Sequence, residues 1–157
     1  MNYLLISPNF PKSQEYFAAR LKDKGITVLG VGAESYDELS PRLQEVITEY
    51  FKVSDLENYN EVLKAVAFLT YKHGKIDRVE SNNEYWLELD AKIREDFNVF
   101  GVKPKELQLT KYKSNMKDIF RKAGVRVVEG LSVSNNEEFD RAIESLGLPV
   151  IAKPDNG

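Results

Sequence analysis

The run Tyr3-Leu-Leu-Ile6, closed by the breaker Pro8-Asn9-Phe10-Pro11, decides the fold of this chain. Its apolar residues follow one another without alternation, which is typical of a strand that is buried on both faces. A helix is expected to begin at Ser13 and to stop at Gly25, and a second buried strand is expected at Ile26–Val31. A strand, a helix and a second strand in this order predict the first crossover of a parallel sheet.

The alternation of strands and helices continues to residue 97. The further signals are a short helix from Pro41, a strand at Tyr50–Val53, a helix that Asn58 and Glu61 begin as a capping box, a strand at Ile76–Glu80, and a helix at Glu84–Phe97. This order predicts an α/β fold with a doubly wound parallel sheet, Rossmann-like, over residues 1–102.

Residues 103–157 follow a different pattern, which begins at an expected hinge, Lys103-Pro104. An amphipathic helix is expected at Ser114–Ala123, and a second one is expected to begin at a capping box of Ser134 and Glu137. Short strands are predicted at Val125–Val128, Leu131–Val133 and Val150–Lys153. Because two helices and three short strands are too few to enclose a hydrophobic core, we expect an incomplete α+β subdomain. The exposed edge of its last strand should either pair with a second copy in a homodimer or fray.

Composition narrows the class of protein. The chain has 157 residues, of which 42% are hydrophobic and 30% charged, as in an ordinary globular protein. It has no cysteine and one histidine, which excludes disulfides, a thiol nucleophile and histidine-rich zinc sites. No apolar run approaches membrane-spanning length, so we expect a cytoplasmic protein with no membrane partner.

Charge is distributed unevenly along the chain. Residues 1–100 carry 12 basic and 17 acidic side chains, whereas the segment Lys103–Arg126 carries eight basic and two acidic ones. Such a run is usually a solvated helix face, and it is also suited to the phosphates of a nucleotide or of a nucleic acid. Because the first hundred residues are acidic, we expect no nucleic-acid partner.

Two lysines stand in settings that suit phosphate binding. Lys153 follows the apolar run Pro149-Val-Ile-Ala152, and a lysine that emerges from a buried strand needs a partner for its charge. Lys113 stands directly before an amphipathic helix, whose free N–H groups and dipole attract anions. Taken singly, each is an ordinary surface lysine; aimed together at one cleft, the two would suit a triphosphate.

The segments around these lysines resemble a known superfamily. They read Lys111-Tyr-Lys-Ser-Asn-Met-Lys-Asp-Ile-Phe-Arg-Lys-Ala-Gly-Val125 and Leu148-Pro-Val-Ile-Ala-Lys-Pro-Asp-Asn-Gly157. A lysine before a helix that ends in Ala-Gly-Val, followed further along by Pro, apolar residues and Lys-Pro, resembles the opening of an ATP-grasp ligase of the carbamoyl-phosphate synthase or biotin carboxylase kind. The resemblance covers the whole chain, with residues 1–102 similar to a pre-ATP-grasp domain and residues 103–157 similar to the first part of an ATP-grasp domain.

The resemblance implies a ligase that uses ATP and Mg²⁺ to activate a carboxylate as an acyl phosphate, which an amine or similar nucleophile then attacks. It also implies that Lys113 and Lys153 contact the ATP phosphates and that Asn156 and Gly157 begin the loop covering them. Tyr112 departs from the pattern, because an acid often precedes the first lysine. The Mg²⁺ ligands and the adenine-binding part would lie beyond residue 157, so this N-terminal portion alone is expected to be inactive.

A polar cluster follows the strand predicted at Ile76–Glu80, and ligands of doubly wound folds gather at such carboxyl ends. The cluster consists of Glu80, Asn82, Asn83 and Glu84. One interpretation is a turn with a helix N-cap, for which Asn and Glu are well suited. The other is a binding site for a small-molecule carboxylate substrate.

A second class of function stays open beside the ligase. The chain would then be a non-catalytic, flavodoxin-like interaction module whose basic arm docks on a partner or on RNA. The sequence identifies neither the carboxylate nor the nucleophile of a ligase, because a fold hosts many substrates.

Overall fold

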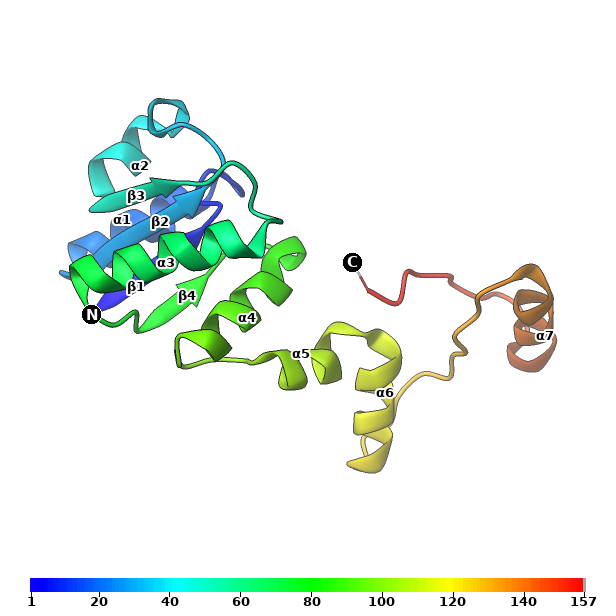
Figure 1. The fold of residues 1–157 in the computed structure, drawn as a ribbon. Coiled ribbons are helices and arrows are strands. Elements are labelled where there is room, and N and C mark those ends of the chain that lie inside the picture. The colour runs from blue at the N-terminus through cyan, green and yellow to red at the C-terminus, as the bar shows by residue number, and fades with distance from the viewer. Residues whose placement is uncertain (157) are drawn as a thin grey trace. The chain divides into compact units, whose positions relative to one another are not determined.

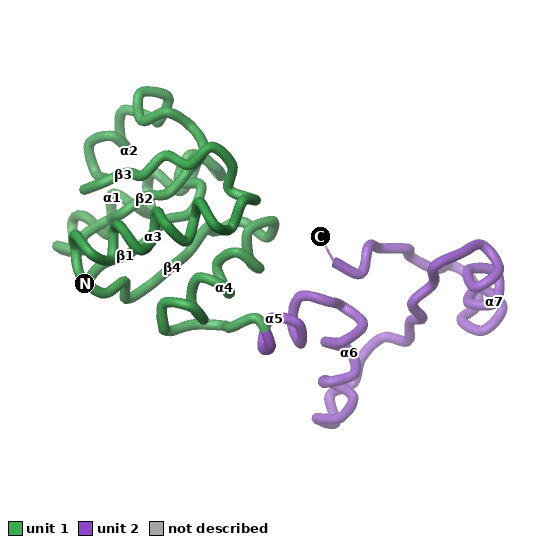
Figure 2. Tube along the Cα trace, in the orientation of Figure 1, with its two compact units in different colours: residues 1–104 green, residues 105–157 purple. Residues whose placement is uncertain are grey.

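The computed structural model of the chain describes residues 1–156 and divides into two compact units (Figure 2). The first unit is Met1–Pro104, and the second consists of the residues from Lys105 onward. The division lies close to the hinge expected at Lys103-Pro104; the assignment of the two units to domains of a ligase stays a prediction. No helix within residues 1–156 has both the length and the apolarity needed to cross a membrane.

The first unit is built on a four-stranded parallel sheet with the order β3-β2-β1-β4 (Figure 1). The strands are β1 (Asn2–Ile6), β2 (Thr27–Gly32), β3 (Glu49–Lys52) and β4 (Arg78–Glu80). Because β1 lies between β2 and β4, its backbone pairs on both edges, with Leu4 opposite Leu29 on one side and Val79 on the other. The predicted strands of the first unit and its doubly wound parallel sheet are confirmed.

Helices cover both faces of this sheet (Figure 1). Tyr3 and Leu5 of β1 pack with α1 and α2, whereas Leu4 and Ile6 pack with α3 and α4. Successive strand residues point to opposite faces, so the unbroken apolar run of β1 supplies both cores. The helices are α1 (Gln14–Asp23), α2 (Pro41–Val46), α3 (Tyr59–His73) and α4 (Leu87–Asp96), with 3₁₀ turns η1 (Tyr36–Glu38) and η2 (Glu84–Trp86).

The start of α3 differs from the predicted capping box. Asn58 is the N-cap residue, but its side chain makes no capping bond in the described structure. The Glu61 carboxylate instead accepts from the Ser54 backbone N–H at 2.8 Å and from the Ser54 hydroxyl at 2.7 Å. The carboxylate therefore fixes the loop before the helix, because Ser54 offers it two donors.

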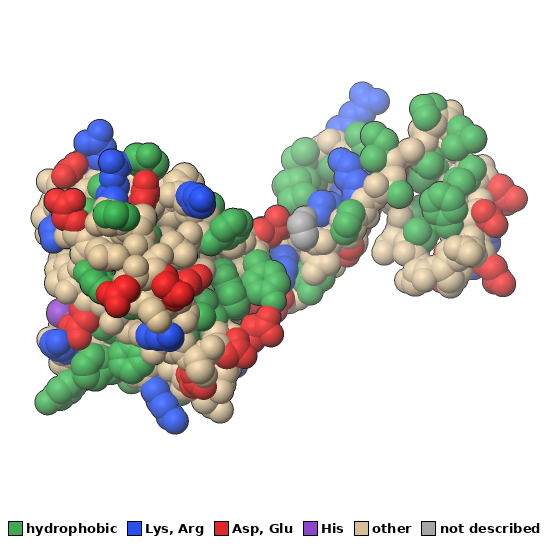
Figure 3. All heavy atoms as spheres, turned by 90° about the horizontal axis from the view of Figure 1, so that it is seen from above, with side chains coloured by type: hydrophobic (Ala, Val, Ile, Leu, Met, Phe, Trp, Pro, Cys, Tyr) green, Lys and Arg blue, Asp and Glu red, His purple; other side chains and the backbone are tan. Residues whose placement is uncertain are grey.

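The second unit contains three helices: α5 (Pro104–Lys111), α6 (Lys113–Lys122) and α7 (Asn136–Leu146). The cap of α7 is one residue later than predicted, because the Asn135 side chain accepts from the Glu138 N–H at 2.9 Å while the Ser134 N–H donates to the Glu138 carboxylate at 2.7 Å. Among the hydrophobic residues described in this unit, Leu107 and Ala142 are buried. Apolar side chains are accordingly visible on its surface (Figure 3).

The three strands predicted in the second unit are wrong, since no strand forms within residues 105–156. The segments Val125–Val128, Leu131–Val133 and Val150–Lys153 are irregular, and side chains such as Val128 and Ile151 are each 82% exposed. An apolar run becomes a strand only when a neighbouring backbone pairs with it. The unpaired, exposed segment Val150–Lys153 agrees with the fraying alternative, and a homodimer through this segment stays a prediction.

Candidate functional site

Two separate places carry the side chains that the sequence predicts to be functional. One is the carboxyl end of β4 in the first unit, and the other is the amino end of α6 in the second unit.

The carboxyl ends of β1 and β4 form a topological switch point, because the chain runs from β1 to β2 and β3 on one side and then places β4 on the other. Doubly wound folds bind ligands at this position. Ser7, directly after β1, has φ of 51°, and Asn82, after β4, has φ of 52°. Left-handed backbone at non-glycine residues costs about 1–3 kcal/mol and is concentrated at functional sites.

The loops that follow β1 and β4 are tied together by Gln14. Its side chain is 2% exposed, and with the amide nitrogen turned towards the two carbonyls it donates to Ser81 at 3.0 Å and to Phe10 at 3.1 Å. The two sides of the switch point are thus held at a fixed separation.

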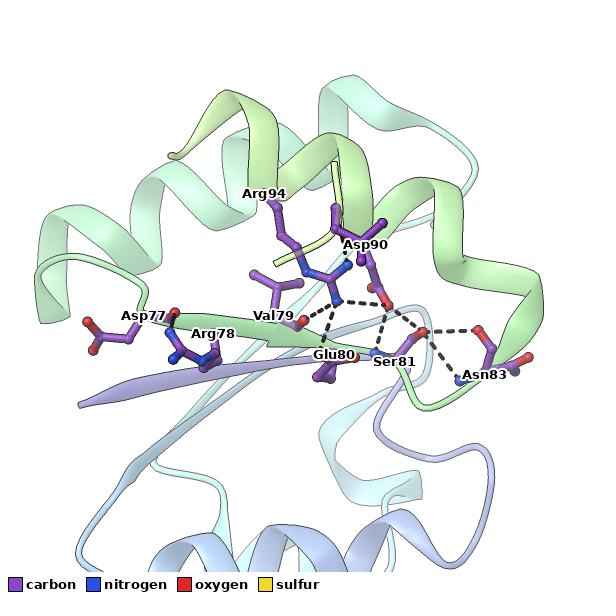
Figure 4. Close-up of polar contacts among 9 residues, drawn as sticks. Asp77, Arg78, Val79, Glu80, Ser81, Asn83, Asp90 and Arg94 are labelled. Atoms are coloured by element: carbon purple, nitrogen blue, oxygen red, sulfur yellow. Dashed lines mark hydrogen bonds and ion pairs between the residues drawn. The ribbon is translucent and has the colours of Figure 1, made fainter. Parts of the chain in front are cut away.

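A charged network on β4 and α4 supports the polar cluster (Figure 4). The Arg94 guanidinium, whose side chain is 6% exposed, lies 3.1 Å from the Glu80 carboxylate. It donates to the Val79 carbonyl at 2.6 Å and to the Val102 carbonyl at 3.3 Å. Glu80 is therefore held at the end of the strand by an arginine that is itself fixed to the backbone.

Asp90 is the acidic partner within this network. Its carboxylate is fully buried, accepts from the Ser81 N–H at 3.0 Å and hydroxyl at 2.7 Å, and lies 4.0 Å from Arg94. Burial raises the pKa of Asp90 from 3.8 to about 6, against the opposing effects of the Ser81 hydrogen bonds and the Arg94 charge. Asp90 thereby holds the first residue of the loop that carries Asn82 and Asn83.

The predicted substrate-binding residues do meet at this edge, and part of the cluster is a turn with a helix cap. The Asn83 side chain accepts from the Tyr85 N–H at 3.0 Å and so caps η2. Asn82 and Glu84 expose their side chains, and Glu80 is 39% exposed beside Arg94. The N-cap interpretation is thus realised at Asn83, and a binding role for the four residues stays a prediction.

In the second unit, Asp155 connects the two segments that carry the lysine motifs. Its carboxylate accepts from the Ser114 N–H and from the Ser114 hydroxyl, each at 2.8 Å. Its carbonyl accepts from the Lys113 backbone N–H at 3.0 Å and from the Lys113 ammonium at 3.3 Å. Lys113 therefore lies next to the segment that contains Lys153 and Asn156, although 40 residues separate the lysines in sequence.

The other predicted phosphate ligands are Lys153, Asn156 and Gly157. Lys153 and Asn156 are exposed, and Gly157 lies outside the described residues. The ammonium groups of the two lysines are cations that suit phosphate oxygens. Within residues 1–156, no group of three or more acidic or histidine side chains is arranged to hold a metal ion, so we assign no Mg²⁺ ligand.

The sequence prediction missed the residues that organise both places. Asp90 and Arg94 are four residues apart on a predicted helix, and this spacing of opposite charges is a recognisable pairing signal. Asp155 and Ser114 offered no comparable signal, because their contact joins positions 41 residues apart.

Comparison with known proteins begins with sequence. No protein-family model matches the chain. An alanine–anticapsin ligase of Bacillus subtilis (strain 168) is 33% identical over 78 residues, which are 50% of this chain and 16% of that protein. An alanine–anticapsin ligase of Bacillus amyloliquefaciens is 25% identical over 111 residues, which are 71% of this chain and 20% of that protein. The chain thus matches a fifth or less of the length of these relatives.

Solved structures share the fold. Phosphoribosylglycinamide synthetase from Anaerococcus prevotii aligns with 94% of this chain and 35% of its own, with a TM-score of 0.66 and 21% identity. An L-amino acid ligase from Bacillus licheniformis aligns with 92% of this chain and 42% of its own, with a TM-score of 0.57 and 16% identity. The biotin carboxylase domain of a single-chain bacterial carboxylase has a TM-score of 0.67 and 17% identity over 94% of this chain and 35% of its own. Together with the sequence similarity to the alanine–anticapsin ligases, this shared fold confirms the resemblance to ATP-grasp ligases that the lysine motifs carry.

Proposed function

We propose that the chain is the N-terminal portion of an ATP-dependent ligase that activates a carboxylate as an acyl phosphate for attack by an amine. The superfamily supports the reaction class, and the matched relatives support the substrate class, because they include alanine–anticapsin ligases and an L-amino acid ligase. The carboxylate is accordingly that of an amino acid or a similar small molecule.

The observation that carries this proposal is the contact between Asp155 and the start of α6. It brings Lys113 to the Lys153-Pro-Asp-Asn156 segment, so that the two motifs of the resemblance lie together. Bound ATP would supply the phosphoryl group that the carboxylate accepts. Lys113 and Lys153 would hold its phosphate oxygens and stabilise their charge, which is the main catalytic resource in phosphoryl transfer.

The first unit would bind the substrate at the carboxyl end of β4. The Asn82 amide can donate to a carboxylate, and the carboxylates of Glu80 and Glu84 suit an ammonium group. Glu80 would do so from a position fixed by Arg94. A small zwitterion such as an amino acid offers both charges.

The test uses the ligase that contains this chain and measures ADP release that depends on amino acids. Lys113→Ala and Lys153→Ala should each lower kcat/KM by a factor equivalent to about 2–4 kcal/mol of transition-state stabilisation, the cost of removing one fixed charge-stabilising donor. Lys117→Ala is the matched control, because Lys117 lies on the same helix away from its amino end, and it should cost little.

Three equal losses would instead indicate diffuse basic charge, as in an interaction module with a basic arm. The 157-residue chain by itself should release no ADP above background. Turnover by the chain alone would contradict its assignment as the N-terminal portion of the ligase.

A further inference from the structure

The start of α6 is capped from a distant part of the chain. A helix leaves its first N–H groups without partners inside the helix. Tyr112, the N-cap residue, makes no capping bond with its side chain in the part of the chain that the structure describes. The N–H groups of Lys113 and Ser114 donate instead to the carbonyl and carboxylate of Asp155.

The electrostatics of this contact are favourable on three counts. A carboxylate at the amino end of a helix interacts well with the helix dipole. The hydrogen bonds from Ser114, together with the nearby Lys113 charge, hold the pKa of Asp155 below its usual range. Asp155 therefore stays ionised near neutral pH, when the cap is at full strength.

We propose that Asp155 is a positioning residue, which caps α6 and thereby holds Lys113 beside the Lys153–Asn156 segment. The capping role rests on the four hydrogen bonds alone, whereas its catalytic consequence rests on the proposed function. The lysines are the groups that would contact phosphate, and Asp155 acts through them.

Asp155 could act as a clamp, whose bonds to α6 persist when phosphate binds, or as a plug, which phosphate displaces. The geometry favours the clamp. A phosphate at the Ser114 N–H would have to break both 2.8 Å bonds of the Asp155 carboxylate. The Lys113 ammonium is held by the longest of the four contacts, at 3.3 Å. It can turn towards a phosphate while the other three bonds remain.

The first experiment tests the cap by NMR on the 157-residue chain, and it needs no ligase activity. Asp155→Ala removes the carboxylate that accepts from Ser114, so it should shift the Ser114 amide resonance and speed its hydrogen exchange about fivefold, the size of effect expected for a lost helix cap. Asp118→Ala is the matched control: Asp118 lies on the same helix, exposed and away from its amino end. It should leave the Ser114 amide unchanged, and an unchanged Ser114 amide in Asp155→Ala would overturn the cap.

The second experiment tests positioning in the ligase that contains the chain. Asp155→Ala should raise KM for ATP about fivefold with a smaller effect on kcat, and Asp155→Asn should retain part of the affinity because its amide oxygen still accepts from Ser114. A lower KM for ATP in Asp155→Ala would identify a plug and overturn the clamp. An unchanged KM would also overturn the clamp. If Lys113→Ala also had no effect, the proposed function would fail with the positioning role, while the cap would still be decided by the chain alone.

Discussion

Replacement of Arg94 by alanine tests whether the network at the end of β4 is a buried electrostatic unit. Arg94 is 6% exposed and is the basic partner of the fully buried Asp90, and it also donates to the carbonyls of Val79 and Val102. Removal of one partner from a buried ion pair typically costs ~3–5 kcal/mol, because the other charge stays without compensation. The Arg94 stem also lies against Gly101, where an added Cβ would come within 2.8 Å of the Arg94 Cδ, so packing is lost as well.

The loss of stability should depend on pH. Because the pKa of Asp90 is already raised to about 6, removal of the guanidinium raises it further, and the carboxyl group then takes up a proton near neutral pH. The penalty disappears when Asp90 is neutral. Arg94→Ala should therefore destabilise the first unit more at pH 8 than at pH 5.5.

The assay is urea unfolding followed by the fluorescence of Trp86, the single tryptophan of the chain, which packs against the core of the first unit. Arg20→Ala is the matched control in the same unit, since Arg20 and its partner Asp23 are 82% and 62% exposed and such pairs are worth about 0–1 kcal/mol. Adding Asp90→Asn to Arg94→Ala should recover part of the loss at pH 8, because a neutral amide needs no counter-charge. A loss below ~1 kcal/mol in Arg94→Ala, equal at both pH values, would refute a buried pair.

Three further predictions concern the first unit. The pKa of Asp90 is about 6 in the folded state and 3.8 ordinarily, so the contribution of Asp90 to stability is complete below pH 4 and is lost as pH rises through 6. The difference between the two pKa values corresponds to roughly 3 kcal/mol. Urea unfolding at several pH values should show this fall in the free energy of unfolding in the wild type and not in Asp90→Asn. Glu61→Ala should lower stability through loss of its bonds from Ser54, whereas Asn58→Ala should lower it much less, and equal losses in urea unfolding would restore the predicted capping box. Gly32→Ala places a Cβ within 2.4 Å of the Tyr50 hydroxyl and should cost about 1–3 kcal/mol in thermal unfolding; Tyr50→Phe in the same chain should recover part of it, and no recovery would indicate that the backbone is the obstacle.

Local sequence pattern was sufficient to predict the strands, the helices and the parallel sheet of the first unit. The apolar run Tyr3–Ile6 predicted a buried strand and Gly25 predicted the end of a helix, and both signals depend only on neighbouring residues. Since strands that alternate with helices have few ways to pack, the parallel sheet followed from their order. The lysine motifs also lie within short segments, so residue types and spacing were sufficient to indicate the superfamily.

Contacts between residues far apart in the sequence could not be predicted from local pattern. Val150–Lys153 has the composition of a strand, but strand formation depends on a partner backbone, and none pairs with it within residues 105–156. The Glu61 carboxylate accepts from Ser54 and from the Asn58 side chain, and not from the Asn58 backbone N–H, which donates to the Asp55 carbonyl. A capping motif inferred from spacing does not include such competitors.

The sequence by itself therefore determined the order of strands and helices, the doubly wound sheet, and the two lysine segments, because apolar periodicity, breakers and short motifs act over a few residues. Only the tertiary structure decided that Arg94 and Asp90 hold the end of β4 and that Asp155 caps α6 beside Lys113. The free energy of a buried charge or of an unpaired N–H group depends on which group the fold brings next to it, and that neighbour is set by the path of the whole chain.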